Sequence, residues 1–206
     1  HRDLHSFPTR RSSDLIKIGL KINVSSLLVI PTFLYMKPFI LWMTGLPCSG
    51  KTTIVKDLQK DIPNLAMLDG DELREWFSPK DFSKAGRDEH NKKVAHLAKL
   101  LLNHGVPSIV SLVSPYVENR ENAREIIAAG DQFAEVYVKC SLAKCEERDV
   151  KGMYAKARKG EIKGFTGIDD PYEAPEKADL VIDTEHDPLS DSANKVKDFL
   201  NERNLL

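Results

Sequence analysis

Three features that would point to particular classes of protein are scarce in this sequence of 206 residues. Its only cysteines are Cys48, Cys140 and Cys145, an odd number without metal-ligand spacing, so we expect a reducing cytoplasm rather than a disulfide framework. Its charge is nearly balanced, with 30 Lys and Arg against 31 Asp and Glu, which argues against a nucleic-acid partner. No apolar run is long enough to span a bilayer, so we expect no membrane partner.

The sequence does have enough apolar residues for a folded domain. Hydrophobic residues make up 41% of the chain, which argues against disorder. The length suits one domain of ordinary size with its own core.

Residues 1–35 do not look like part of that domain. His5–Leu15 reads HSFPTRRSSDL, which resembles the translation of a widely used sequencing adapter. The apolar run Leu27–Tyr35 follows it without clean periodicity. A signal peptide is the alternative, because basic residues precede the run, although no small-residue cleavage site follows it. We expect a non-native or disordered extension over 1–35 and a domain over 36–206.

The domain alternates short apolar runs with helical patterns. Expected strands cover Phe39–Thr44, Leu65–Leu68, Ser108–Val113, Glu135–Lys139 and Asp179–Asp183. Expected helices cover Lys51–Gln59, Arg87–His104 and Leu189–Asn201. This alternation predicts an α/β fold with a five-stranded parallel sheet and helices on both faces. Ligands of such sheets bind beyond the carboxyl ends of the strands.

A phosphate-binding loop follows the first expected strand. Gly45–Thr52 reads GLPCSGKT and matches G-x-x-x-x-G-K-[ST], with an apolar strand before it and a helix after it. Backbone N–H groups of such a loop face phosphate oxygens, helped by the helix N-terminus. Lys51 should reach the β- and γ-phosphates of ATP, and the Thr52 hydroxyl should bind Mg²⁺. The alternative is a glycine-rich turn that holds Lys-Thr by chance. The predicted ATP contacts are Gly45, Leu46, Pro47, Cys48, Ser49, Gly50, Lys51, Thr52 and Thr53.

Two carboxylates and an arginine follow the second expected strand. Because alternate residues of a strand point the same way, Asp69 and Asp71 could both face the phosphates. One of them could accept the proton of an attacking hydroxyl, and Arg74 could pair with an anion on the acceptor. The alternative is a turn in which one aspartate caps a helix. The third strand ends without an aspartate, so these carboxylates would have to serve the metal.

These motifs resemble the adenylylsulfate kinase family of P-loop kinases. The resemblance is carried by Gly45–Thr53, Leu68–Arg74 (LDGDELR), Phe82–Arg87, Ser111–Tyr116 and, most specifically, Cys145–Pro175 (CEERDVKGMYAKARKGEIKGFTGIDDPYEAP). It implies a P-loop kinase fold and transfer of the γ-phosphate of ATP, with Mg²⁺, to the 3′-hydroxyl of adenosine 5′-phosphosulfate. The product is 3′-phosphoadenylylsulfate, the activated sulfate donor.

The resemblance also implies residue roles. Asp71 and Lys51 are implied to be catalytic, with Asp71 as the base, and Lys151–Gly167 is implied to be a mobile lid. Acceptor contacts are implied at Asp71, Arg74, Phe82, Arg87, His90, Ser114, Lys163 and Phe165, with Arg148 implied on the ATP side. Both partners would be small nucleotides, and a homodimer is one assembly that the sequence leaves open.

The sequence departs from the family at one helix. The family pattern R-x-x-N-I-R-R is replaced by RDEHNKK, with His90 in place of the Asn and Asn91 in place of an apolar residue. A related group on the same scaffold phosphorylates a cytidine-diphosphate-linked metabolite, so such an acceptor is the alternative function. A nucleotide-binding switch without phosphotransfer is a third, although it would need neither the paired carboxylates nor the lid.

The interpretation of residues 1–35 gives the first prediction. A chain beginning at Met36 should keep full activity and lose less than about 1 kcal/mol of unfolding free energy, since no sequence pattern joins the extension to the sheet. Denaturant unfolding and turnover of both chains test this. A larger loss would make the extension part of the domain.

Overall fold

The computed structural model describes residues 36–77 and 81–206, so the interpretation of residues 1–35 concerns a part outside the described residues. The strands are β1 (Ile40–Thr44), β2 (Ala66–Asp69), β3 (Ser108–Ser111), β4 (Phe133–Lys139) and β5 (Leu180–Asp183). The helices are α1 (Lys51–Asp61), α2 (Gly70–Phe77), α3 (Lys84–Asn103), α4 (Val117–Ile127), α5 (Leu142–Arg148), α6 (Met153–Arg158) and α7 (Leu189–Glu202), with a 3₁₀ turn, η4, at Gly130–Gln132.

The five strands form one parallel sheet in the order β2-β3-β1-β4-β5. In the central strand β1, Ile40 lies opposite Ser108 of β3 on one side and Phe133 of β4 on the other. The predicted five-stranded parallel sheet is therefore confirmed.

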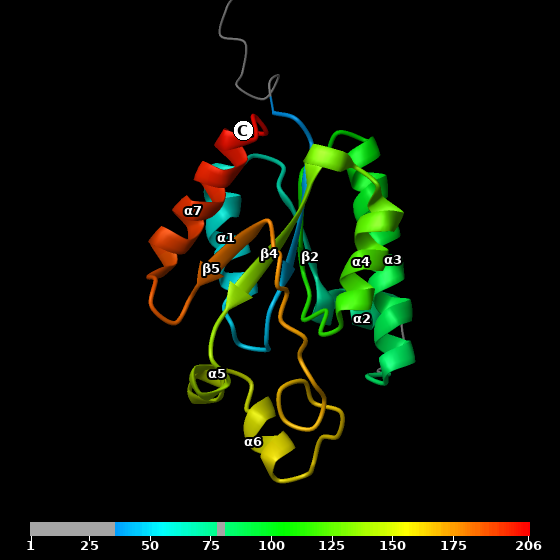
Figure 1. Ribbon diagram of the computed structural model, residues 1–206, viewed down its shortest axis with the longest axis vertical. Helices are drawn as coiled ribbons and strands as arrows, with labels where there is room; N and C mark the ends of the chain where they lie inside the picture. Colours follow the sequence, from blue (N-terminus) through cyan, green and yellow to red (C-terminus); the bar gives the residue numbers. More distant parts are fainter. Residues whose placement is uncertain (1–35, 78–80) are drawn as a thin grey trace, which may run out of the picture. The chain divides into compact units, whose positions relative to one another are not determined.

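Helices cover both faces of the sheet, as predicted (Figure 1). Alternate residues of β1 point to opposite faces. Leu41 and Met43 pack in the cluster that contains residues of α1 and α7, whereas Ile40 and Trp42 pack in the cluster with α3 and α4. All of them are fully buried, which explains why this strand reads as a continuous apolar run rather than an alternating one.

The element boundaries follow local capping. Helix α3 begins at Lys84, three residues before its predicted start, because the Ser83 hydroxyl accepts a hydrogen bond from the Gly86 N–H at 3.1 Å. Gly105, which follows the helix, has φ of 76°, the left-handed conformation typical of a glycine just beyond a helix C-terminus. Strand β3 ends at Ser111, two residues before the predicted end.

The predicted lid lies beyond the carboxyl ends of the strands (Figure 1). It consists of helix α6 followed by turns through Gly160, Gly164 and Gly167, each with φ above 60°. Tyr154 of α6 is buried in a small cluster with Cys140 and Cys145, against which Phe165 packs. The segment therefore has a packed base, and its mobility stays a prediction.

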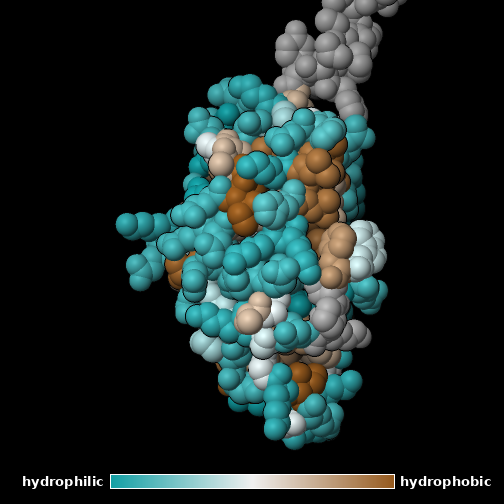
Figure 2. Space-filling model, turned by 90° about the vertical axis from the view of Figure 1, so that its right-hand side faces the viewer, coloured by the Kyte–Doolittle hydropathy of each residue, from teal (hydrophilic) through white to brown (hydrophobic). Residues whose placement is uncertain are grey.

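The surface on the side of α3 and α4 is largely hydrophilic, with separate hydrophobic patches (Figure 2). Within residues 36–77 and 81–206, no helix is both long and apolar enough to cross a bilayer.

Candidate active site

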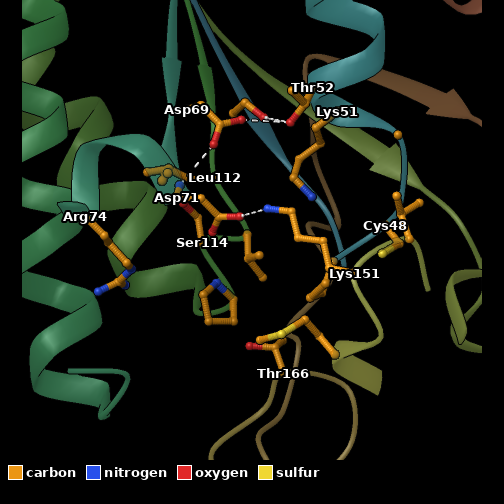
Figure 3. Close-up of a pocket in the computed structure, with 18 of the residues that line it drawn as sticks. Cys48, Lys51, Thr52, Asp69, Asp71, Arg74, Leu112, Ser114, Lys151 and Thr166 are labelled. Atoms are coloured by element: carbon orange, nitrogen blue, oxygen red, sulfur yellow. Dashed lines mark hydrogen bonds and ion pairs between the residues drawn. The ribbon is translucent and has the colours of Figure 1, made fainter. Parts of the chain in front are cut away.

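A cavity of about 1090 Å³ lies at the carboxyl ends of β1, β2 and β3. Most of the predicted site residues line it, and Figure 3 shows several of them. Those on its wall are Pro47, Cys48, Gly50, Lys51, Thr52, Thr53, Asp71, Arg74, Phe82, Arg87, His90, Ser114, Arg148, Lys163 and Phe165. The other three, Gly45, Leu46 and Ser49, do not line the cavity but contact the Lys51 side chain.

The loop between β1 and α1 is held close to neighbouring backbone. A Cβ atom on Gly45 would lie 2.5 Å from the Val138 carbonyl oxygen of β4, so only glycine fits there. Gly50 precedes α1 with φ of 101°, which a residue with a side chain rarely adopts. The two glycines thus serve the close approach and the left-handed turn that open helix α1 to a phosphate.

The Lys51 ammonium group lies inside this loop. It is 7% exposed and donates hydrogen bonds to the carbonyl oxygens of Gly45 and Leu46, both at 2.8 Å, and to the Ser49 hydroxyl at 3.2 Å. Burial lowers the pKa of Lys51 to about 8. Burial destabilises the charged form of the lysine. An anion in place of the neutral carbonyl groups would stabilise that form strongly.

Asp69 joins the phosphate loop to α2. Its carboxylate accepts a hydrogen bond from the Thr52 hydroxyl at 2.8 Å and another from the Asp71 N–H at 3.0 Å. The expectation that strand alternation aligns the two carboxylates was wrong, because β2 ends at Asp69 and Asp71 lies in the first turn of α2. Asp69 therefore caps helix α2, as the alternative reading predicted, and its other oxygen faces Thr52.

Asp71 points into the cavity and pairs with Lys151, the first residue of the predicted lid (Figure 3). The Lys151 ammonium nitrogen lies 2.5 Å from the carboxylate, with the side chains 66% and 73% exposed. The hydrogen bond to Asp71 raises the pKa of Lys151. Ion pairs this exposed contribute little stability, so a competing anion can separate them.

The far side of the cavity combines arginines with an aromatic ring. The Arg74 guanidinium lies 4.7 Å and that of Arg87 5.7 Å from the centre of the Phe82 ring. Arg87 donates to the Phe82 carbonyl at 2.9 Å and to the Gly164 carbonyl at 2.7 Å. One buried guanidinium thus connects α3 to the lid at positions next to both predicted aromatic walls, Phe82 and Phe165.

Phe165 forms part of the lid side of the cavity. Its ring packs edge-on against Tyr154, with ring centres 4.9 Å apart and an interplanar angle of 79°. Its N–H donates to the Asp169 carboxylate at 2.6 Å. The ring is half-buried, which leaves part of it available to a ligand.

His90 lines the cavity without a hydrogen-bond partner. Its side chain is 1% exposed, and neither ring nitrogen has a partner in hydrogen-bonding geometry among the residues that the structure describes. The Gly70 backbone lies close enough to the ring to oppose part of the fall in its pKa. Burial, helped by the positive charges of Arg74 and Lys93, lowers the pKa of His90 to about 4, so the ring is neutral near pH 7. A buried polar group without a partner is costly, and such groups occur chiefly where a ligand or water satisfies them.

Arg148 lies on the other side of the phosphate loop. Its guanidinium donates to the Thr184 carbonyl at 2.5 Å and approaches the Cys48 carbonyl at 3.4 Å. It borders the cavity next to the phosphate loop, and its role on the ATP side stays a prediction.

Two residues on the cavity wall were not singled out from the sequence. Lys151 was one of several lid lysines, and its pairing with Asp71 spans 80 residues. Asn91 was noted only as a departure from the family pattern, yet it accepts a hydrogen bond from Ser114 at 2.7 Å. No local pattern could have found either contact, because both join residues distant in sequence.

The comparison with known families agrees with this geometry. The family model described as adenylylsulphate kinase matches residues 37–183. The chain belongs to the adenylylsulphate kinase family. The adenylyl-sulfate kinase of Staphylococcus epidermidis is 40% identical over 175 residues, covering 82% of this chain and 87% of the relative. That of Halothermothrix orenii is 42% identical over 171 residues, covering 81% and 91%.

A solved relative has the same fold. The APS kinase of Mycobacterium tuberculosis in complex with AMPPNP and APS is 39% identical, with a TM-score of 0.76, and the match covers 81% of this chain and 99% of that one. Membership of the family and the P-loop kinase fold expected from the sequence are therefore confirmed.

The buried ammonium of Lys51 predicts a pH dependence. Lys51 must be charged to bind phosphate, and it loses its proton as pH rises through a pKa of about 8. We expect kcat/KM for ATP, which reports the free enzyme, to be maximal below about pH 8 and to fall above it.

Lys51→Arg is the matched control, because a guanidinium stays charged throughout this range. Its residual activity should show no fall between about pH 7 and about pH 10. A wild-type profile that stays flat over the same range would contradict the assignment.

Proposed function

We propose that this protein is a kinase that transfers the γ-phosphate of ATP to the 3′-hydroxyl of adenosine 5′-phosphosulfate, giving 3′-phosphoadenylylsulfate. The observation that carries the proposal is a single cavity bordered by the phosphate loop on one side and by Arg74, Phe82 and Phe165 on the other. Membership of the adenylylsulphate kinase family supports the same function. The activity belongs to the phosphotransferases that use an alcohol group as acceptor.

On the ATP side, the loop from Gly45 to Thr53 would hold the phosphates through its N–H groups and Lys51. Arg148 would border the nucleotide next to Thr184. Lys51 would exchange its two carbonyl partners for phosphate oxygens, where its charge counts most as negative charge shifts during transfer.

The residues near Thr52 fit a magnesium ion. Mg²⁺ favours oxygen ligands and is held in kinases by one or two protein oxygens together with phosphates and water. The Thr52 hydroxyl and the Asp69 carboxylate already lie 2.8 Å apart at the edge of the cavity. When bound there, Mg²⁺ would neutralise charge on the transferring phosphates.

On the acceptor side, Asp71 would take the proton from the attacking hydroxyl. Its carboxylate can do so only after Lys151 moves or shares it with the acceptor. Phe82 and Phe165 would enclose the adenine ring, and Arg74 and Arg87 would anchor the phosphosulfate. His90, Ser114 and Lys163 would supply further polar contacts, with the two unpartnered nitrogens of His90 available for the acceptor.

The segment Lys151–Gly167 would close over both nucleotides. Its lysines and arginine place positive charge against two polyanions, and its turns pass through glycines with positive φ. A cytoplasmic location is supported by the cysteines, all three of which are free. The homodimer stays a prediction.

An acceptor screen tests the proposal. The purified protein with ATP and Mg²⁺ should phosphorylate adenylylsulfate in preference to cytidine-diphosphate-linked compounds. Lys51→Ala should lower turnover by on the order of 10²–10³ while leaving the melting temperature unchanged, which excludes a contaminating kinase. Preferred turnover of a cytidine compound would favour the alternative acceptor. ATP binding without transfer to any acceptor would favour a nucleotide-dependent switch.

Phe165 provides a test of the acceptor pocket. Stacking of a base on an aromatic ring contributes roughly 1–3 kcal/mol, so Phe165→Ala should raise the KM for adenylylsulfate by about 5- to 150-fold. The KM for ATP should change much less, because ATP is held mainly by the phosphate loop.

The control for this test is Phe77→Ala, which removes an exposed aromatic ring outside the cavity and should change neither KM. If Phe165 instead serves only to pack against Tyr154, the variant should lose roughly 3–5 kcal/mol of stability and both KM values should rise together. Melting temperatures measured alongside both KM values separate these outcomes.

A further inference from the structure

A chain of buried hydrogen bonds runs from the central strand to helix α3 behind the cavity. The Trp42 indole N–H donates to the Ser114 hydroxyl at 3.1 Å, and that hydroxyl donates to the Asn91 Oδ1 at 2.7 Å. The Asn91 Nδ2 in turn donates to the Arg87 carbonyl at 2.7 Å. These four residues are at most 6% exposed. The chain therefore links two residues of the proposed acceptor site, Ser114 and Arg87, through Asn91.

The Ser114 end of this chain is a strained turn. Ser114 has φ of 41°, a left-handed conformation that residues other than glycine seldom adopt and that usually costs of order 1–3 kcal/mol. Its carbonyl oxygen accepts a hydrogen bond from the Arg120 guanidinium at 2.8 Å and one from the Thr44 hydroxyl at 3.3 Å. Such a conformation persists only where several contacts hold it, and Asn91 supplies one of them.

The Arg87 end leads to the aromatic walls. The Arg87 guanidinium binds the carbonyl groups of Phe82 and Gly164 and lies 3.7 Å from the Asp170 carboxylate. Asn91 is one helical turn further along α3. Its bond to the Arg87 carbonyl fixes which way its amide faces, because a flipped amide would set oxygen against oxygen. The amide oxygen is thereby directed at Ser114.

We propose that Asn91 is a positioning residue of the acceptor site, which fixes the Ser114 hydroxyl and the turn that carries it relative to Arg87. This inference rests on the proposed function. Asn91 acts through its neighbours, because both ends of its amide are already hydrogen-bonded within the protein. The adjacent His90 differs in this respect, since both of its ring nitrogens remain unpartnered among the described residues.

The decisive variant is Asn91→Leu, which has the same number of side-chain heavy atoms and removes both side-chain hydrogen bonds. A buried hydroxyl that loses its acceptor reorients or leaves its position. We expect the KM for adenylylsulfate to rise roughly 5- to 30-fold, as loss of a buried hydrogen bond implies. The KM for ATP should stay within about twofold, since no contact of Asn91 reaches the phosphate loop.

Asn119→Leu is the matched control. Asn119 is also buried, at 2% exposed, and it also holds α3, by donating to the Asp88 carboxylate at 2.9 Å. It does not line the cavity. We expect this control to lower the melting temperature but to leave both KM values within about twofold of wild type.

Two further variants test whether Asn91 acts through Ser114. Asn91→Asp keeps an oxygen that accepts from Ser114 but sets its other oxygen against the Arg87 carbonyl, so its KM for adenylylsulfate should lie between those of wild type and Asn91→Leu. In a Ser114→Ala background, Asn91→Leu should add less than about a twofold change, because the group it positions is gone. Asn91→Ala, which also removes both side-chain hydrogen bonds, carries the test if Asn91→Leu fails to fold.

Several results would overturn the inference. These are an unchanged KM for adenylylsulfate in Asn91→Leu, an equal rise in both KM values, or independent effects of Asn91→Leu and Ser114→Ala. Failure of the proposed function looks different, because the wild-type protein would then prefer another acceptor or transfer no phosphate to adenylylsulfate.

Discussion

The site depends on one buried positive charge inside the turn between β1 and α1. Lys51 can be buried there because two carbonyl oxygens and a hydroxyl accept its hydrogen bonds. Those carbonyls are available because Gly45 lies against the β4 backbone and Gly50 turns left-handed. This burial lowers the pKa of Lys51. The loop is therefore preorganised for an anion, and the rest of the site is arranged around the phosphate that this charge would hold.

The other side of the cavity departs from ordinary packing at two neighbouring places. His90 is buried without partners among the described residues, and Ser114 has a strained backbone. Each costs on the order of 1–3 kcal/mol, which the core on both faces of the sheet offsets. Unfavourable features of this kind, such as unsatisfied polar groups and strained backbone, are found chiefly at functional sites. Both departures border the cavity, which supports the acceptor site on grounds that do not depend on any relative.

Features of the fold and the site could be predicted from the sequence where the residues that form them are close together along the chain. The phosphate loop and the strands are local features, and the structure has the strands within two residues of their predicted bounds. The cap at Ser83 is also local, but periodicity does not report it, so α3 begins earlier than predicted. Asp71 and Lys151 are 80 residues apart in the sequence, so no local pattern reveals that they form a pair.

One side of the cavity is formed mainly by backbone groups and the other mainly by side chains. This difference explains why the chain departs from its family in α3 and not in the phosphate loop. The proposed ATP side would use backbone N–H groups, a helix terminus and one lysine, so the spacing of its glycines cannot vary. The proposed acceptor side would use side chains of α2, α3 and the predicted lid, which Arg87 connects through two carbonyl groups that any residue supplies. A side chain in α3 can change if its hydrogen bonds are rebuilt nearby. The pair His90 and Asn91 has that form, since one amide completes the framework while the adjacent ring stays available to a ligand. Substitutions in α3 could therefore change which acceptor the protein prefers without any change in the proposed ATP-binding loop.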